Sequence, residues 1–152
     1  MSSLRLRHHN NCPRCPVIGA EDIPGEEYFE ILSLRFNIAV ARRLSAKHDL
    51  IRVEPLALAR WLQHARILES HLWHLPTNAG HGIIVTLPAG CGKPVIDGNH
   101  RAARALRLGE PFFAAELSES ETLELLRLSM SPAIADHFWR QMLASRSHPA
   151  DR

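Results

Sequence analysis

The sequence is short of cysteine, of long apolar runs and of net charge, and each shortage excludes a class of protein. Three cysteines, two of them in the close pair Cys12 and Cys15, do not make the framework of a disulfide-rich secreted domain. No stretch approaches the roughly 18 consecutive apolar residues of a membrane-spanning helix. The basic first ten residues lack the apolar centre of a signal peptide. We therefore expect a cytoplasmic protein without membrane contact.

The charge balance is close to neutral. Lysine and arginine number 18 against 16 aspartates and glutamates, which gives a formal net charge of +2. This balance excludes a polycation that coats nucleic acid with its whole surface, although it leaves room for a local basic face. Nearly all of the cations are arginines, and an arginine can bind a phosphate through two N–H groups at once. The 10 histidines also make metal binding worth considering.

The apolar content is sufficient for one compact domain, since 45% of the 152 residues are hydrophobic. Helix-like and strand-like stretches alternate along the chain, which predicts an α+β fold with a small mixed sheet flanked by helices. We expect an irregular N-terminal arm over residues 1–25 and a single domain over 26–147. The core of that domain is expected at about 50–130.

The expected helices have apolar residues three or four positions apart, and the expected strands are short apolar or alternating stretches. The helices are predicted over 26–47, over 55–74, from 99 to 108, after the capping-box pattern Ser118-x-x-Glu121, and from Ser131-Pro132 to about Ser145. The strands are predicted at 50–54, 83–87, 94–96 and 112–117. In the last helix the expected buried residues are Ile134, Phe138, Met142 and Leu143.

The segment from Lys93 to Gly109 carries most of the functional information. It predicts a buried strand, a tight turn and a helix, and the first N–H groups of a helix have no partners inside it. Gly98 lets the backbone approach a ligand, and Asp97 or Asn99 can cap the helix. His100 and Arg101 add side-chain donors beside the bound anion. The pattern therefore predicts an anion site and favours phosphate.

The stretch Val95-Ile-Asp-Gly-Asn-His-Arg-Ala-Ala-Arg-Ala-Leu-x-x-Gly109 resembles the signature of the ParB/sulfiredoxin superfamily. In that superfamily a strand, a Gly-X-His-Arg-type turn and an Ala-rich helix form a nucleotide phosphate site. The order of the expected elements from Leu50 to Met130, about half the chain, is similar as well. The resemblance implies a ParB/sulfiredoxin-like fold that binds ATP or another nucleoside triphosphate such as CTP, with Mg²⁺. The phosphate contacts that it implies come from Gly98, Asn99, His100 and Arg101, with Arg104 at the periphery.

Two departures from that superfamily narrow the implied function. Sulfiredoxins carry their catalytic cysteine immediately before His-Arg, where this chain has Asn99, and Cys91 is too far upstream to replace it. We therefore do not expect repair of cysteine sulfinic acid. The segregation-type ParB proteins carry a Gly-Glu-Arg-Arg-type motif and a helix-turn-helix domain, for which the single helix after Met130 is too little. Free serine kinases and small bacterial plasmid- or phage-borne members with ATPase or nuclease activity remain open comparisons.

A phosphotransferase additionally needs a carboxylate that orients or deprotonates the acceptor. Glu54, at the end of the first predicted strand, and Asp97 are the candidates for this catalytic role. Both have a purely structural alternative. Asp97 is typical of a turn or a helix cap, and Glu54 is typical of an acid at the start of a helix.

The N-terminal pair Cys12-Pro-Arg-Cys15 is a weak zinc candidate. His8 or His9 and a distant residue such as Cys91 would complete four ligands. A single CxxC without a second pair is more typical of an ordinary reduced segment, so we expect no metal site here.

Histidines and arginines elsewhere have ordinary interpretations too. His64, His71 and His74 share one side of a predicted helix, which permits metal binding but is more typical of a solvated edge. The arginine pair at 42–43 and the arginines of 101–107 would form basic faces for nucleic acid. The low net charge favours solvated faces instead.

Sequence and resemblance together predict a nucleotide-binding protein, with Mg²⁺-dependent NTPase, kinase or nuclease activity left open. The alternative belongs to another class: a DNA-associated or protein-interaction module of the plasmid or phage ParB-like type, without catalysis. In that alternative the helices at either end of the domain dock a protein partner or a second copy, and docking of a second copy would make the protein a homodimer.

Overall fold

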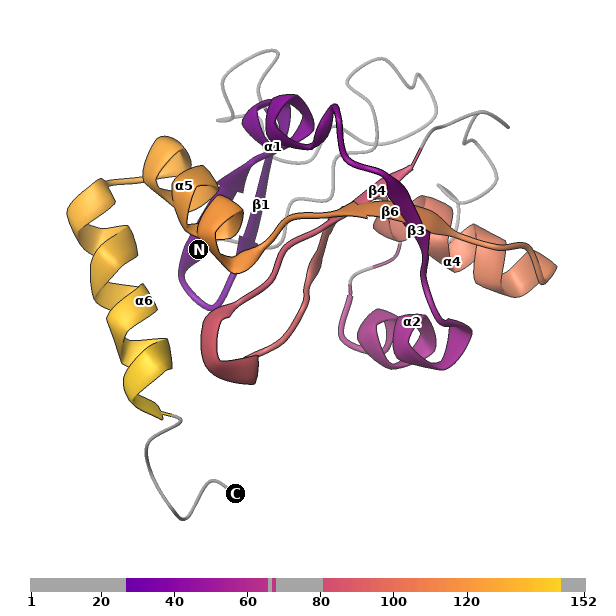
Figure 1. Cartoon of the computed structure of the whole chain (residues 1–152). Coiled ribbons are helices and arrows are strands. Elements are labelled where there is room, and N and C mark those ends of the chain that lie inside the picture. Colours follow the sequence, from indigo (N-terminus) through magenta and orange to yellow (C-terminus); the bar gives the residue numbers. More distant parts are fainter. Residues whose placement is uncertain (1–26, 66, 68–80, 146–152) are drawn as a thin grey trace.

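A computed structural model gives the fold of residues 27–65, 67 and 81–145 (Figure 1). As predicted, the fold is α+β, with a two-stranded hairpin and a four-stranded sheet. The strands are β1 (Tyr28–Ile31), β2 (Leu34–Asn37), β3 (Leu50–Arg52), β4 (Gly82–Ile84), β5 (Val95–Asp97) and β6 (Phe113–Glu116). The helices are α1 (Ile38–Ser45), α2 (Pro55–Leu62), the short 3-10 helix η1 (Pro88–Gly90), α4 (Asn99–Leu108), α5 (Glu119–Ser129) and α6 (Pro132–Ser145).

The helix predicted over 26–47 is wrong in its first half, where Tyr28–Asn37 form an antiparallel hairpin. The loop of the hairpin is Leu32-Ser33, and both residues have positive φ angles, 51° and 67°. Two positive φ angles are typical of a type I′ turn, whose twist matches that of the two strands. The usual residues of such a turn are asparagine, aspartate and glycine. The sequence therefore carries no local signal for this hairpin.

The second half of that predicted helix is confirmed as α1. Asn37 caps its N-terminus, where its Oδ1 atom accepts a hydrogen bond from the Val40 amide at 3.2 Å. In the hairpin, Phe29, Leu34 and Phe36 are buried. Leu34 and Phe36 are two residues apart, which is the spacing of one strand face.

The four-stranded sheet has the order β3-β6-β4-β5, in which β6 and β4 are parallel and the other neighbouring pairs are antiparallel. Successive residues of a strand face opposite sides of the sheet. Accordingly, Ile83 and Ile96 join one apolar cluster with the hairpin, α1, α5 and α6, whereas Ile84 and Val95 join another with α2 and α4. Figure 1 shows α5 and α6 at one end of the molecule and α2 and α4 at the other.

The helix predicted over 55–74 is corrected at its end. α2 ends at Leu62, because the amides of His64 and Ala65 bond to carbonyls three residues back, and such bonds tighten and close a helix end. No glycine or proline marks this end in the sequence. Residues 66 and 68–74 of the predicted helix lie outside the described residues, as does the N-terminal arm over 1–25.

The burial predicted for the last helix is half right. Phe138 and Met142 are half-buried against the core, whereas Ile134 and Leu143 are exposed. The fully buried residues of α6 are Ala135 and Trp139. With Phe138 and Met142 these two form one stripe at helical spacing, and the two exposed residues fall beside it.

The remaining elements agree with the sequence. The strands predicted at 50–54, 83–87 and 112–117 are present as the shorter β3, β4 and β6, and the strand predicted at 94–96 is β5, shifted by one residue. The predicted capping box opens α5, with Ser118 Oγ accepting from the Glu121 amide at 3.2 Å and the Glu121 carboxylate accepting from the Ser118 amide at 2.9 Å. Among the helices of the described ranges, none has the length and apolar character needed to cross a bilayer.

Candidate functional site

The turn between β5 and α4 has a glycine as its N-cap. Gly98 has a φ of 93°, in the left-handed region, and offers no side chain to the first amides of α4. The expectation that Asp97 or Asn99 caps this helix is wrong, because both side chains bond elsewhere. The N-cap is instead Gly98, a residue without a side chain. Gly98 itself thus supplies no capping side chain to the first-turn amides.

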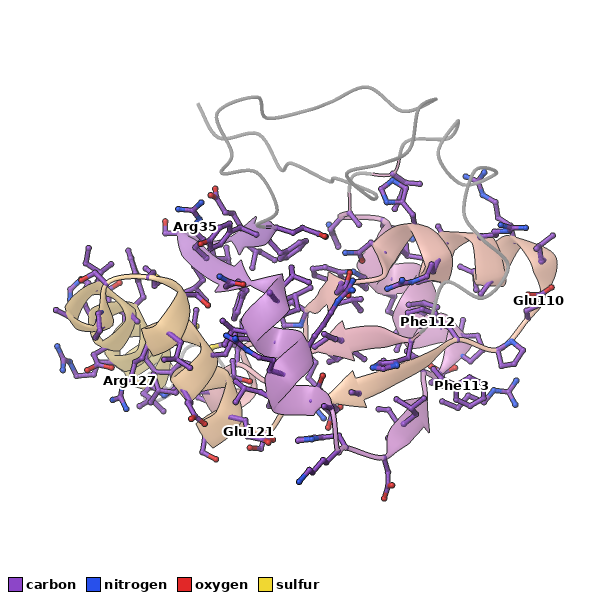
Figure 2. The ribbon with its side chains drawn as sticks, turned by 90° about the horizontal axis from the view of Figure 1, so that it is seen from above. Arg35, Glu110, Phe112, Phe113, Glu121 and Arg127 are labelled. Atoms are coloured by element: carbon purple, nitrogen blue, oxygen red, sulfur yellow. The ribbon has the colours of Figure 1, made fainter. Side chains whose placement is uncertain are left out.

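Gly98 is required by the packing of the turn as well as by its φ angle. A Cβ atom at Gly98 would lie 3.0 Å from the Cα atom of Gly82, the first residue of β4. A Cβ atom at Gly82 would in turn lie 2.4 Å from the ring of Phe112. Phe112 immediately precedes β6 and lies beside Phe113 (Figure 2). In this fold, the missing side chain of Gly98 therefore allows its backbone to pack closely against β4, and not only against a ligand.

Asp97 ends β5, and its carboxylate binds two arginines. Its side chain is 9% exposed, and its Oδ2 atom lies 2.8 Å from Nη2 of Arg42 and 3.5 Å from Nη2 of Arg101. Arg42 also donates from Nε to the same oxygen at 3.1 Å. Two guanidinium groups thus lie beside one buried carboxylate. Arg42 comes from α1, and the sequence motif gives no sign of it.

The other basic residues of the motif lie along the same helix. His100 is buried, and Arg101 is largely buried and donates from Nη2 to the carbonyl of His81 at 3.1 Å. Arg104, one turn further along α4, is half-buried. The structure therefore places His100 and Arg101 in the first turn of α4, as predicted, and Arg104 farther from the N-terminus of the helix.

The side chain of Asn99 points into the protein. It is 3% exposed, its Nδ2 donates to the carbonyl of Val95 at 2.9 Å, and its Oδ1 accepts from Trp61 Nε1 at 2.6 Å. Trp61 lies on α2. The pair joins α2 to the first turn of α4. A phosphate contact from Asn99 would therefore use its backbone N–H.

Glu54 is the N-cap of α2. Its two carboxylate oxygens accept from the amides of Leu56 and Ala57 at 3.0 and 2.9 Å. These two bonds hold the pKa of Glu54 below its ordinary value of 4.5. The geometry thus agrees with the structural alternative for this residue. Its catalytic role stays a prediction.

The structure does not bring Glu54 and Asp97 into contact. Glu54 follows β3 and Asp97 ends β5; these two strands run in the same direction, so both residues lie at the same edge of the sheet. The strands β6 and β4 separate β3 from β5. Three strand spacings of about 4.8 Å put the two strand ends about 14 Å apart. One phosphoryl acceptor could not contact both carboxylates at that distance. Of the two residues, Asp97 is the one next to the β5–α4 turn.

The capping role of Glu54 predicts a specific dependence of stability on pH. Because the pKa of Glu54 is lowered in the folded state, its stabilising effect is complete above pH 4.5 and is lost as the pH falls through the folded-state pKa. Glu54→Gln should therefore be less stable than the wild type at pH 6, and the difference should shrink in acid. Urea denaturation between pH 6 and pH 3 measures this. Glu124→Gln, an exposed position within α5, is the control. A difference that is independent of pH would contradict the capping role.

The weaker metal candidates receive no support from the described residues. Within those ranges, no three histidine, cysteine or acidic side chains gather closely enough to hold a metal ion. Cys12, Cys15, His71 and His74 lie outside them, and His64 is exposed in the turn after α2. Cys91 follows η1, with its Sγ atom 3.8 Å from the carbonyl oxygen of Met142.

Comparison with known proteins adds no relative: no family model, no curated protein and no solved structure matches the chain. The functional argument therefore rests on the β5–α4 turn, the arginines around it and the resemblance of its sequence.

Proposed function

We propose that this protein binds the phosphate groups of a nucleotide, ATP or CTP, at the turn Gly98–Arg101. The observation that carries the proposal is the left-handed glycine N-cap of α4, which has no side chain of its own to cap the amides of the first turn. Such amides, together with the positive end of the helix dipole, bind anions. A helix of ten residues provides both.

The side chains around the turn favour the same ligand. Arg101 and Arg42 both lie beside the helix end, where their guanidinium groups share the carboxylate of Asp97. His100 belongs to the same turn. Charge-assisted hydrogen bonds from such groups are about twice as strong as neutral ones. An anion with several oxygens therefore matches the site better than a neutral ligand.

The resemblance to the ParB/sulfiredoxin superfamily supplies the rest of the proposal. It concerns residues 95–109 and the order of the elements from β3 to α5, and it favours a nucleotide over inorganic phosphate. Mg²⁺ would then be held largely by the ligand's phosphates and by water, as is common for this ion. Asp97 is the carboxylate nearest the turn. Hydrolysis or transfer of the terminal phosphoryl group is a further prediction of the resemblance.

Calorimetric titration with ATP, CTP and GTP in the presence of Mg²⁺ tests the proposal. We expect the wild type to bind at least one of them. The double variant His100→Ala/Arg101→Ala should weaken that binding by at least about tenfold, since each charge-assisted hydrogen bond contributes roughly 1.5–3 kcal/mol. The matched control is Arg60→Ala/His64→Ala, which removes the same two residue types from exposed positions on and after α2.

Two results would contradict nucleotide binding at this turn. One is a wild type that binds none of the three nucleotides. The other is a double variant that binds as tightly as the control while remaining folded by circular dichroism. If the wild type instead shifted a DNA duplex with a steep dependence on salt, the DNA-associated alternative would be favoured.

A further inference from the structure

The outer edge of β3 has no neighbouring strand in the part of the chain that the structure describes. β3 is the first strand in the order β3-β6-β4-β5, and it pairs with β6 alone. The Val53 amide donates to the Phe112 carbonyl at 2.9 Å, so Val53 and Ile51 turn their backbone groups towards β6. Because this direction alternates along an antiparallel strand, the N–H and C=O groups of Leu50 and Arg52 point to the outer edge. Such an edge can pair with another strand.

Apolar side chains accompany this edge on both faces of the sheet. Leu50 is 48% exposed, Ile51 is 41% exposed, and Phe113, which lies opposite Arg52 on β6, is 43% exposed. Leu50 and Phe113 belong to one face and Ile51 to the other, because successive residues of a strand face opposite sides. By contrast, β5 at the other end of the strand order is buried along its whole length. A strand that paired with β3 would cover apolar groups on both faces.

A second copy of the chain can pair with this edge about a two-fold axis, which makes the two β3 strands antiparallel. The hydrogen bonds must then join the residues whose backbone groups face the edge, Leu50 and Arg52. An axis centred on Arg52 would place the two arginines opposite each other, which is destabilising. An axis centred on Leu50 would place Ile51 opposite the charged Asp49 of the second copy. The remaining choice is an axis centred on Ile51.

The register centred on Ile51 matches the side chains on both faces. The two Ile51 residues meet at the axis in a non-hydrogen-bonded pair, in which opposite Cα atoms lie about 4.5 Å apart. On the other face, the Arg52 stem lies between Phe113 of its own chain and Leu50 of the second copy. An arginine stem covers apolar surface while its charged end stays in water. No like charges lie directly opposite each other among these residues.

We propose that β3 is a homodimer interface, in which residues Leu50–Arg52 of two copies pair antiparallel about Ile51 and join the two four-stranded sheets. This inference is independent of the proposed nucleotide binding. It places the second copy at a sheet edge and not on the helices at either end of the domain. The pairing has about four backbone hydrogen bonds, so the interface is small and the dissociation constant should lie at about 10–500 µM.

Sedimentation equilibrium of the full chain tests the association. Between about 10 µM and 1 mM the weight-average mass should rise from that of the 17.1 kDa monomer towards twice that value. Ile51→Lys places two ammonium groups opposite each other at the axis, so it should weaken association by at least about tenfold. The matched control is Leu128→Lys, which adds the same charge at a 59% exposed leucine of α5 and should change association by less than about twofold.

Cross-linking tests the register. In a full chain whose Cys12, Cys15 and Cys91 are replaced by serine, Ile51→Cys should form a disulfide between two copies under mild oxidation. The expected Cα separation of about 4.5 Å lies within the range of disulfides. Asp49→Cys is the control, because the two copies of residue 49 would lie about 13 Å apart along the strands. Ile51→Cys should therefore cross-link at least about ten times faster than Asp49→Cys.

Three results would overturn the interface. The first is a wild type that is monomeric up to about 1 mM, twice the weakest expected dissociation constant. The second is an association that Ile51→Lys, folded by its thermal melt, weakens no more than Leu128→Lys does. The third is a cross-linking rate of Ile51→Cys no higher than that of Asp49→Cys, a comparison that stays decisive if the lysine variant does not fold. None of these results bears on nucleotide binding, which the titrations above test separately.

Discussion

Phe36→Ala is expected to lower the free energy of unfolding by about 3–5 kcal/mol, the usual cost of removing a buried aromatic ring. The Phe36 side chain is 0% exposed in β2, where it lies opposite Phe29 in the hairpin and on the strand that contacts α5. Alanine would leave a cavity between the hairpin and α5. Close-packed neighbours fill such a cavity only in part. Equilibrium unfolding in urea measures the loss.

Leu32→Ala is the control that makes this measurement informative about the fold. Leu32 is 70% exposed at the turn of the hairpin, so its truncation should change the free energy of unfolding by less than about 0.5 kcal/mol. In a helix over 26–47, Leu32 and Phe36 would lie four residues apart on the same face, and both truncations would be costly. Similar large losses for the two variants would contradict the hairpin.

The sequence predicts best those elements whose ends carry a side-chain or glycine signal. The helix α4 begins after Gly98 and ends before Gly109, both with left-handed φ angles, and α5 opens with a capping box. The hairpin and the end of α2 lack such signals. Leu32-Ser33 takes up a turn usually made by asparagine and glycine, and α2 ends after Leu62 without glycine or proline. Patterns in the local sequence therefore mislead at both places.

The candidate site shows the same division between local and long-range information. Gly98, His100 and Arg101 are brought together by consecutive residues of one turn, so the motif alone predicts them. Arg42 binds Asp97 from 55 residues earlier in the chain, and Trp61 binds Asn99 from 38 residues earlier. No local sequence pattern could have found these two residues. The direction of a side chain at the start of a helix also depends on the residues that pack against it in the folded protein. The sequence therefore does not show that Asn99 points inward.

Asn99→Ala is expected to lower the free energy of unfolding by about 1–3 kcal/mol, because it leaves a buried acceptor without its partner and removes the bond of a second, part-buried group. The two groups are the indole N–H of Trp61 and the carbonyl of Val95, which bond to the amide of Asn99 at 2.6 and 2.9 Å. Urea denaturation again measures the change. A loss below about 0.5 kcal/mol, the size of an ordinary surface substitution, would contradict these bonds.

A double-mutant cycle with Trp61→Phe isolates the bond between α2 and α4. Trp61→Phe removes the N–H donor and part of the ring, so it is destabilising on its own. In combination with Asn99→Ala, the loss of that bond is counted only once. The combined cost should therefore be smaller than the sum of the two single costs, by about 1 kcal/mol for one hydrogen bond. Strict additivity would show that Trp61 Nε1 and Asn99 do not interact in solution.

The same Asn99→Ala variant separates a structural role from a ligand-binding role at this position. The Asn99 side chain bonds to Val95 and Trp61, so a bound phosphate would meet only its backbone N–H. While the variant remains folded, its ATP affinity should fall by less than about threefold, against at least about tenfold for His100→Ala/Arg101→Ala. A variant with wild-type stability and strongly reduced ATP affinity would reverse this assignment, because the amide would then have to face the ligand. Such a result would require the first turn of α4 to open towards the nucleotide and to exchange the bond with Trp61 for one with phosphate.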